Sequence, residues 1–485
     1  MNYKMMSRFE AWILAIEAVF MLPALLISLF SDGGRVALAF AVSIGVLLAT
    51  AGILALASRG AHEGFYAREG LICVSVGWIL MSLFGCLPFW LSGEIPHFVD
   101  ALFEMVSGFT TTGASVLSDV ESLSRGILYW RSFSHWLGGM GVLVFLLAIV
   151  PSGGRREGFT MHLLRAESPG PDVSKIAPKM RQTAIALYLT YVGLTVLNFI
   201  FLLFGDMSVF EAVCTALGTA GTGGFGIKND SMASYSPYVQ NVTTAFMLAF
   251  GVNFSCYYLI LLRRVRAVLR DEELRVYIGL VVAGVALIAF NIRGLYETVG
   301  ETVRHAAFQV ASIISTTGFA TTDFDLWPAF SKAILMVFMV TGACAGSTAG
   351  GMKLARAMLL LKGLRRNLSK ILHPQKVQAI RVNDKVIDEQ VLANTNAYLS
   401  AYVIIIVIST LVISLDNFSM MTNFSAVLAC FNNIGPGFEA VGATCNYGGF
   451  GVLSKLVLIL DMLAGRLEIF PILILFGALR ADKVG

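Results

Sequence analysis

The sequence predicts an all-α integral membrane protein with ten transmembrane helices, eight of which form four pseudo-symmetric helix–pore-loop–helix repeats around a central pore. The first observation is composition: the 485 residues are 56% hydrophobic and 14% charged, whereas soluble domains carry about 25% charged residues. The second is a series of apolar runs that reach the roughly 20 residues a helix needs to cross a bilayer. The third is a set of four shorter apolar runs, each leading to a similar glycine.

The long apolar runs give the expected spans. They lie near residues 11–31, 35–58, 71–92, 127–150, 183–205, 238–262, 275–293, 330–361, 396–415 and 453–479. The shorter runs lie near 97–109, 208–217, 303–314 and 421–431, and runs of about 10–14 residues favour re-entrant segments over spans. The first two spans (1–69) stand outside the repeat. The predicted repeats cover 70–155, 180–266, 272–366 and 390–485.

Each short run leads into a segment in which an apolar residue precedes three mostly small or polar residues and a glycine. These segments are Phe109–Gly113, Leu217–Gly221, Ile314–Gly318 and Phe431–Gly435. A phenylalanine precedes each glycine by ten or eleven residues: Phe103, Phe210, Phe308 and Phe424. Repetition of this kind implies pseudo-symmetry around an axis, and parallel repeats around the membrane normal would bring four equivalent loops together.

Basic residues indicate the orientation of the chain. With ten spans, the basic residues near the termini and between the repeats all fall on one side. They are Lys4, Arg8, Arg59, Arg68, the clusters within 155–181, 263–275 and 362–385, Arg480 and Lys483. An excess of Lys and Arg marks the cytoplasmic side, so both termini are expected there. The four glycine segments then enter the membrane from outside.

Four such loops suit a cation. Irregular backbone at membrane depth is tolerated where it lines a water-filled path or is buried in protein. Glycine lets successive carbonyls turn inward and replace the water around a dehydrated cation, and the C-terminus of each preceding short helix adds negative potential. No ring of acidic residues occurs in the four segments, which favours carbonyl coordination. A single such motif is also typical of close helix packing; four matched copies favour a pore.

The four segments, TTTGAS, GTAGTGGFG, STTGFATTD and NNIGPGFEA, resemble those of the Trk/Ktr/HKT superfamily of potassium transporters, and the whole layout is most similar to its bacterial TrkH branch. The resemblance implies a potassium filter and potassium uptake across the bacterial inner membrane, with potassium as the transported ligand and no covalently bound cofactor. The implied filter residues are Thr111, Thr112, Gly113, Thr219, Ala220, Gly221, Thr316, Thr317, Gly318, Asn433, Ile434 and Gly435. Gly223, Gly224 and Gly437 are alternative glycines in the second and fourth loops.

The family pattern also carries expectations about selectivity and partners. The four motifs depart from the TVGYG filter of tetrameric potassium channels, since none has an aromatic residue after a glycine-flanking valine, so we expect some permeation by cations of similar size. The resemblance implies a homodimer surrounded by membrane lipid. It further implies a cytosolic TrkA-type ring of nucleotide-binding domains that docks near 151–181, 263–275 and 362–390.

A gate is predicted beneath the filter. Four glycines within 341–351 weaken a helix by about 1 kcal/mol each relative to alanine, so the run 330–361 is expected to form two half-helices joined by an intramembrane loop. Tight helix packing is the alternative. Arg466, in the last span, either faces the ion path or pairs with Asp461 or Glu468. Together with Gly346, Gly350 and Gly351, it resembles the family's gate.

Two charged residues near these segments have two possible roles each. Lys353, close to the predicted gate, either adds to its barrier or extends its ammonium group to the membrane surface. Glu104, in the first short segment, either attracts cations or belongs to a structural ion pair.

Two other functional classes share part of this pattern. A sodium- or proton-coupled secondary transporter shares the broken helix, but such folds usually show two inverted repeats. A membrane enzyme would need a converging catalytic set, whereas the six histidines and seven cysteines are dispersed; His135, beside Trp136, is expected to pack or to lie at an interface. The sequence therefore predicts a transporter and not an enzyme.

Overall fold

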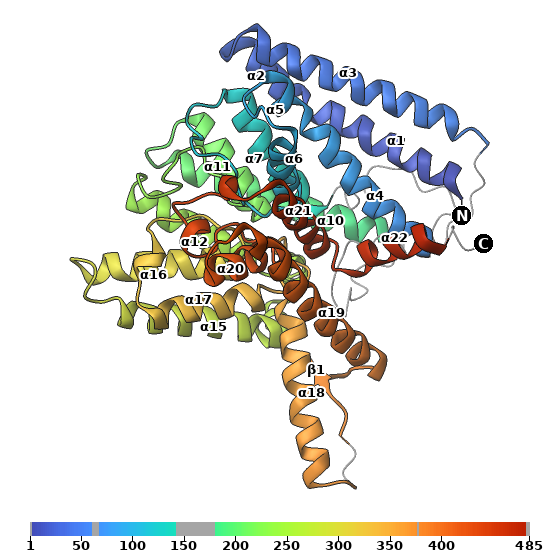
Figure 1. Cartoon of the computed structure of the whole chain (residues 1–485). Coiled ribbons are helices and arrows are strands. Elements are labelled where there is room, and N and C mark those ends of the chain that lie inside the picture. The colour runs from blue at the N-terminus through green and yellow to red at the C-terminus, as the bar shows by residue number, and fades with distance from the viewer. Residues whose placement is uncertain (1, 61–66, 142–179, 376–377, 482–485) are drawn as a thin grey trace.

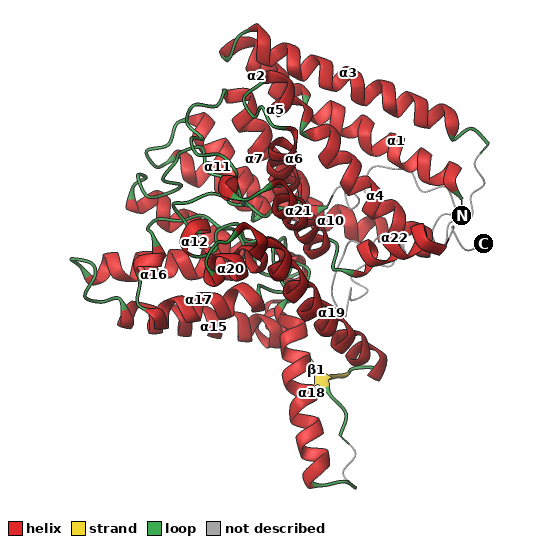
Figure 2. Cartoon of the chain, in the orientation of Figure 1, coloured by secondary structure: helices red, strands yellow, loops and turns green. Residues whose placement is uncertain are grey.

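The computed structural model describes residues 2–60, 67–141, 180–375 and 378–481, which are mostly helical with almost no sheet (Figure 2). The N-terminal part contains α1 (Tyr3–Phe20), α2 (Leu22–Ser31) and α3 (Gly34–Ala57). These helices lie on one flank of the molecule (Figure 1), and α1 and α3 pack closely on each other.

The described residues 67–141 and 180–270 form two successive groups of helices, each with a short buried helix in its middle. The first group is α4 (Ala67–Gly85), α5 (Leu87–Ser92), α6 (Phe98–Phe109) and α7 (Arg125–Met140). The second is α10 (Met180–Leu203), α11 (Val209–Gly221), α12 (Pro237–Phe250), α13 (Phe254–Leu261) and α14 (Val265–Arg270). Residues 142–150 of the predicted span 127–150 lie outside the described residues.

The remaining residues form two further groups. The first is α15 (Glu272–Asn291), α16 (Val299–Ile314), the 3₁₀ turn η1 (Phe324–Leu326), α17 (Ala329–Thr341) and α18 (Leu354–Leu372). The last is α19 (Glu389–Ile413), η2 (Ser414–Asp416), α20 (Met420–Phe431), η3 (Glu439–Val441), η4 (Tyr447–Gly449), α21 (Val452–Arg466) and α22 (Phe470–Ala481). Strands β1 (Arg381–Val382) and β2 (Lys385–Val386) form an antiparallel hairpin near α18, which projects from the body (Figure 1).

Within the described residues, six helices are long and apolar enough to cross a membrane, or seven if the bent pair α12 and α13 counts as one span. That pair corrects the predicted continuous span 238–262, because α12 and α13 meet at an angle of 91°. The expected span 453–479 is also two helices, broken where Glu468 and Ile469 take positive φ angles. The stretch 330–361 forms parts of α17 and α18, joined by residues 342–353.

The short helices α6, α11, α16 and α20 are held at the centre of the molecule. Three of them begin at a hydroxyl N-cap that accepts a backbone N–H three residues on, namely Ser208, Thr298 and Ser419. Such caps satisfy donors that the first helical turn leaves free. In all four helices the residues of the last two turns are buried. The fold therefore places four helix C-termini, and the loops after them, in its interior.

Candidate functional site

The loops that follow the four short helices share one backbone conformation. In each, a residue with φ near +55° is followed two positions later by a glycine with φ between +76° and +95°. The first positions are Thr111, Thr222, Thr316 and Asn433, and the glycines are Gly113, Gly224, Gly318 and Gly435. Positive φ is unusual outside glycine, above all for a β-branched residue. Three threonines held there show that the surrounding structure imposes this conformation.

The same four loops also share their hydrogen bonds. The residue before each glycine donates its backbone N–H to a carbonyl five residues earlier, at 2.8–2.9 Å. These pairs are Thr112 to Ser107, Gly223 to Gly218, Thr317 to Ser312 and Ile434 to Ala429. Each loop is thus tied to the last turn of its own short helix, and the four segments are structurally equivalent.

The four loops meet in a closed ring. A β-carbon added to Gly113 would collide with the Gly223 carbonyl oxygen, one on Gly224 with that of Thr317, and one on Gly318 with that of Ile434. A β-carbon on Gly435 would lie 2.7 Å from the Thr112 carbonyl oxygen, which closes the circle. Each loop therefore presents a carbonyl to the glycine of the loop before it in the ring, and only glycine fits at these four contacts.

The second loop corrects the predicted register. Gly221 is the last residue of α11, and Thr219 and Ala220 are helical; the residues equivalent to Thr111, Thr112 and Gly113 are Thr222, Gly223 and Gly224. Ten residues before Gly224 lies Cys214, not a phenylalanine. In the fourth loop the equivalent glycine is Gly435 rather than Gly437.

His135 explains the extra glycines of the second loop. Its Nδ1 donates to the Gly108 carbonyl at 2.8 Å, and its Nε2 accepts the Phe225 N–H at 3.2 Å, so the imidazole is neutral. A β-carbon on Gly221 would collide with the His135 backbone, and one on Gly223 with its ring. The prediction that His135 packs is confirmed, since the side chain is fully buried.

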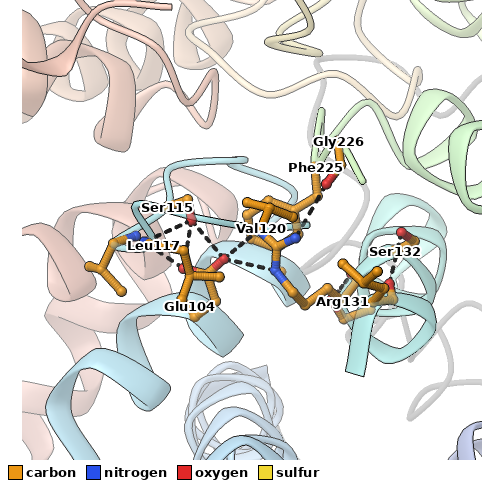
Figure 3. Close-up of polar contacts among 12 residues, drawn as sticks. Glu104, Ser115, Leu117, Val120, Arg131, Ser132, Phe225 and Gly226 are labelled. Atoms are coloured by element: carbon orange, nitrogen blue, oxygen red, sulfur yellow. Dashed lines mark hydrogen bonds and ion pairs between the residues drawn. The ribbon is translucent and has the colours of Figure 1, made fainter. Parts of the chain in front are cut away.

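A buried ion pair braces the first loop against the second (Figure 3). Arg131 Nε and Nη2 donate to Glu104 Oε1 at 2.9 and 2.5 Å. The Glu104 carboxylate accepts hydrogen bonds from the Ser115 hydroxyl and the Val116 N–H of the first loop. On the other side, Arg131 lies 4.0 Å from the centre of the Phe225 ring and donates to the Gly226 carbonyl. Of the two roles considered for Glu104, the structure shows the ion pair.

Breaking this pair is expected to destabilise the protein strongly. Because Glu104 and Arg131 are almost fully buried, Glu104→Gln leaves an uncompensated charge, at a cost of about 3–5 kcal/mol. Arg131→Met should have a similar effect, and the double variant should recover much of the loss. Thermal unfolding in detergent measures all three.

The surface pair of Arg366 and Glu389, in which the Glu389 side chain is 73% exposed, supplies a control for the buried pair. Glu389→Gln should change Tm much less than Glu104→Gln, because water screens exposed charges. Equal Tm shifts for the two substitutions would contradict the bracing role of Glu104.

Residues 342–353 lie directly beneath the loops. The N–H of Gly350 donates to the Thr316 hydroxyl at 2.6 Å, and the N–H of Phe254 donates to the Gly346 carbonyl at 3.0 Å. Gly342, Gly346, Gly351 and Lys353 take positive φ angles. The Lys353 ammonium is buried and donates to the Ala349 carbonyl, so Lys353 does not extend to the membrane surface.

Arg466 joins this segment to the first loop. Its Nη1 donates to the Thr348 carbonyl at 3.0 Å and to the Thr111 hydroxyl at 3.3 Å. Its Nη2 donates to the carbonyls of Gly138 and Gly139 at the end of α7. The carboxylates considered as its partners have other contacts: Glu468 pairs with Arg356, and Asp461 accepts from Ser409. The structure therefore brings Arg466 and the glycine segment together.

Acidic side chains link the outer parts of the loops. Asp325 Oδ2 accepts the Glu439 N–H at 2.7 Å, which joins the third loop to the fourth. Asn229 donates to Asp119 and its backbone N–H to Glu121, which joins the second loop to the first. Burial, supplemented by repulsion from Asp323 and Glu439, raises the pKa of Asp325, whereas the hydrogen bond from Asn229 lowers the pKa of Asp119.

These opposite shifts predict opposite pH effects. Asp325 binds its proton more tightly in the folded state, so ionisation of its carboxyl group lowers the free energy of unfolding. This loss of stability develops as the pH rises through the raised pKa. Asp325→Asn should therefore raise Tm at pH 7, and the gain should vanish on acidification below the ordinary Asp range.

Asp119→Asn should lower Tm at pH 7, and this loss should also shrink in acid. Tm profiles in detergent from pH 3 to pH 8 test both, and a gain for Asp325→Asn that is independent of pH would contradict the assignment.

Comparisons with known proteins agree over nearly the whole chain. The family model TrkH, described as cation transport protein, matches residues 39–288 and 296–484. The Trk system potassium uptake protein TrkH of Salmonella typhimurium is 34% identical over 98% of this chain and 99% of its own length. TrkG of Escherichia coli is 30% identical over 97% and 96%. The crystal structure of the potassium transporter TrkH from Vibrio parahaemolyticus superposes with a TM-score of 0.87 at 30% identity, covering 98% of each chain.

Proposed function

Because this chain belongs to the TrkH family of cation transport proteins, we propose that it carries potassium across the membrane through a channel-like pore lined by main-chain oxygens. The filter is formed by residues 111–113, 222–224, 316–318 and 433–435. The relatives TrkH and TrkG are named as potassium uptake proteins, and potassium is the cation that rings of carbonyl oxygens are known to coordinate.

The observation that carries this proposal is the closed ring of four carbonyls and four glycines. Each of Thr112, Gly223, Thr317 and Ile434 sets its carbonyl oxygen against the glycine of a neighbouring loop. The helices α6, α11, α16 and α20 end just before these loops, so their partial negative charges favour a cation there. The sixteen residues at positions 110–113, 221–224, 315–318 and 432–435 include no charged side chain, which leaves coordination to neutral oxygens.

The proposed architecture has ten spans. Two precede the repeats, and each repeat supplies two spans around a re-entrant helix and loop. This count treats each broken helix, such as α12 with α13 or α21 with α22, as one span. It places both termini on the cytoplasmic side of a bacterial inner membrane, in agreement with the basic residues between the repeats.

Residues 342–353 and Arg466 form the proposed gate. The segment contacts Thr316 of the third loop, and Arg466 contacts Thr111 of the first. A guanidinium below the filter repels cations, and the loop occupies the space beneath it. Gly346, Gly350, Gly351 and Lys353 supply the irregular backbone and the buried ammonium group of this barrier.

A flux assay on the purified chain in vesicles tests the proposal. An outward potassium gradient should drive uptake of rubidium and potassium well above that of sodium, with caesium between. Empty vesicles, and vesicles that contain the Gly318→Ala variant described below, serve as controls. Equal uptake of all four cations would contradict the proposal. Shortening the segment 341–351 should open the path, so the absence of uptake by a folded variant with that segment shortened would contradict the proposal as well.

The breaks at 251–253, 342–353 and 467–469 favour one alternative, since broken helices are typical of coupled secondary transporters. In that case potassium uptake would depend on a sodium or proton gradient. Measuring uptake with the potassium gradient fixed, while the sodium and proton gradients are each removed, separates the two mechanisms. The channel-like pore predicts unchanged uptake.

The proposed partners are a second copy of the chain, membrane lipid and a cytosolic TrkA-type ring. Two of the segments expected to meet the ring, 263–275 and 362–390, are joined in the structure. Asn383 donates to Asp271 at 2.8 Å, and Lys362 donates to Glu272 at 2.5 Å. These two segments are therefore in direct contact. The third expected segment, 151–181, lies almost wholly outside the described residues.

A further inference from the structure

The side chains at the four equivalent positions of positive φ make different hydrogen bonds. These positions are Thr111, Thr222, Thr316 and Asn433. Thr222 donates its hydroxyl to the Gly221 carbonyl of its own loop at 2.6 Å. Asn433 donates to the Thr112 hydroxyl and the Met462 carbonyl, and Thr111 accepts from Arg466. Within the described residues, Thr316 is the member of this set whose side chain accepts a main-chain N–H from residues 342–353.

The contact between Thr316 and Gly350 is closely fitted and buried. Thr316 is fully buried, and its Oγ1 lies 2.6 Å from the Gly350 nitrogen. On its other side, Gly350 abuts the fourth loop: a β-carbon there would lie 2.5 Å from the Asn432 carbonyl oxygen and 2.9 Å from the Asn433 β-carbon. Gly350 is therefore seated between the third and fourth loops, and its N–H has Thr316 as its acceptor.

A threonine at φ +57° is strained, and strain of this kind persists where the surrounding structure or the function requires it. Asparagine tolerates this conformation better and occupies it in the fourth loop. A threonine at position 316 offers a hydroxyl directed at the N–H below it. Removing that acceptor would leave the Gly350 N–H buried without a partner, which is more costly than losing an exposed hydrogen bond.

We propose that the Thr316 hydroxyl is a positioning group that latches residues 342–353 beneath the filter, so that the third filter loop and the gate release each other when the pore opens. The latch rests on the proposed function. The new element is that a filter side chain, that of Thr316, stabilises the closed state together with Arg466.

The test compares three substitutions in vesicles with matched protein amounts. Thr316→Val keeps the β-branch and removes the acceptor, so resting potassium flux should rise at least about 5-fold, the effect expected when a buried donor loses its partner. Thr316→Ser keeps the acceptor, so its resting flux should be close to that of the parent and below that of Thr316→Val. Thr222→Val removes a hydroxyl at the equivalent position of another loop and measures the effect of a filter change that does not involve the gate.

Two further measurements separate a latch from a purely structural role. Hydrogen exchange at the Gly350 amide should be faster in Thr316→Val than in the parent and in Thr222→Val. In a background with residues 341–351 shortened, Thr316→Val should add no further flux, because the two changes act on the same contact. If Thr316→Val does not fold, Thr316→Ala serves the same comparison.

Three outcomes would overturn the latch. Resting flux of Thr316→Val at the parental level, while the shortened segment conducts, would reject the latch and leave the transport proposal intact. Equal increases in Thr316→Val and Thr316→Ser would show that the hydroxyl is not the cause. Absence of flux from every folded variant, including the shortened one, would contradict the transport proposal and the latch with it.

Discussion

Gly318→Ala is expected to reduce potassium flux by at least about tenfold, because a φ of +87° alone costs an alanine about 1–2 kcal/mol. The β-carbon would also collide with the Ile434 carbonyl oxygen and lie 2.9 Å from Pro436. The neighbouring carbonyl must therefore move away from the position at which it would contact a cation. Uptake of potassium and sodium in vesicles measures both the loss and the change in preference.

Gly279→Ala is the matched control for this substitution. Gly279 lies in α15 of the same repeat, and a β-carbon there would meet no atom within 4 Å. In a helix, alanine is favoured over glycine by about 1 kcal/mol, so this variant should fold at least as well as the parent and conduct normally. Parental flux and selectivity in Gly318→Ala would show that the ring of glycines does not line the ion path.

Arg466→Ala is expected to have the largest effect in the opposite direction. A guanidinium about 7 Å from a passing monovalent cation repels it by roughly 2.4 kcal/mol at an effective dielectric constant of about 20. Its loss, together with the loss of the bond to the Thr348 carbonyl, should raise resting flux by up to about 50-fold. Rubidium uptake into vesicles with matched protein amounts measures the increase.

Two comparisons define the cause of that increase. Arg466→Gln removes the charge and keeps hydrogen-bond donors, so it should raise flux less than Arg466→Ala if both the charge and the contact to Thr348 matter. Arg365→Ala removes the same charge from an exposed position of α18 and should leave flux unchanged. Unchanged or reduced flux in Arg466→Ala would contradict a barrier at this position.

The sequence located the glycine of three loops, although Gly437 was an alternative to Gly435 in the fourth. Gly113, Gly318 and Gly435 have the shared conformation, and the motif of small or polar residues before them located each one. In the second loop, Gly221, Gly223 and Gly224 compete, and the motif matched Gly221. Hydropathy cannot show that α11 continues to Gly221 or that His135 occupies the space beside Gly221 and Gly223. These facts depend on a contact between residues about 90 positions apart.

The helix breaks show the same limit. The run 330–361 contains four glycines, so a break was predictable, whereas 238–262 and 453–479 are apolar with only one and two glycines, respectively. Their bends near Gly251 and at Glu468 and Ile469 depend on packing: the Gly251 carbonyl accepts the Cys344 N–H, and Glu468 pairs with Arg356. Likewise, Arg131 gave no sequence signal as the partner of Glu104, because 27 residues and a loop separate them.

Rubidium anomalous scattering from crystals of this protein tests the central claim most directly, because it locates the cation without relying on a mutation. The ring of carbonyls from Thr112, Gly223, Thr317 and Ile434 should contain an anomalous peak that sodium replaces poorly in competition. A chain that transports rubidium in vesicles but binds it away from this ring, with no peak between the four loops, would contradict the account.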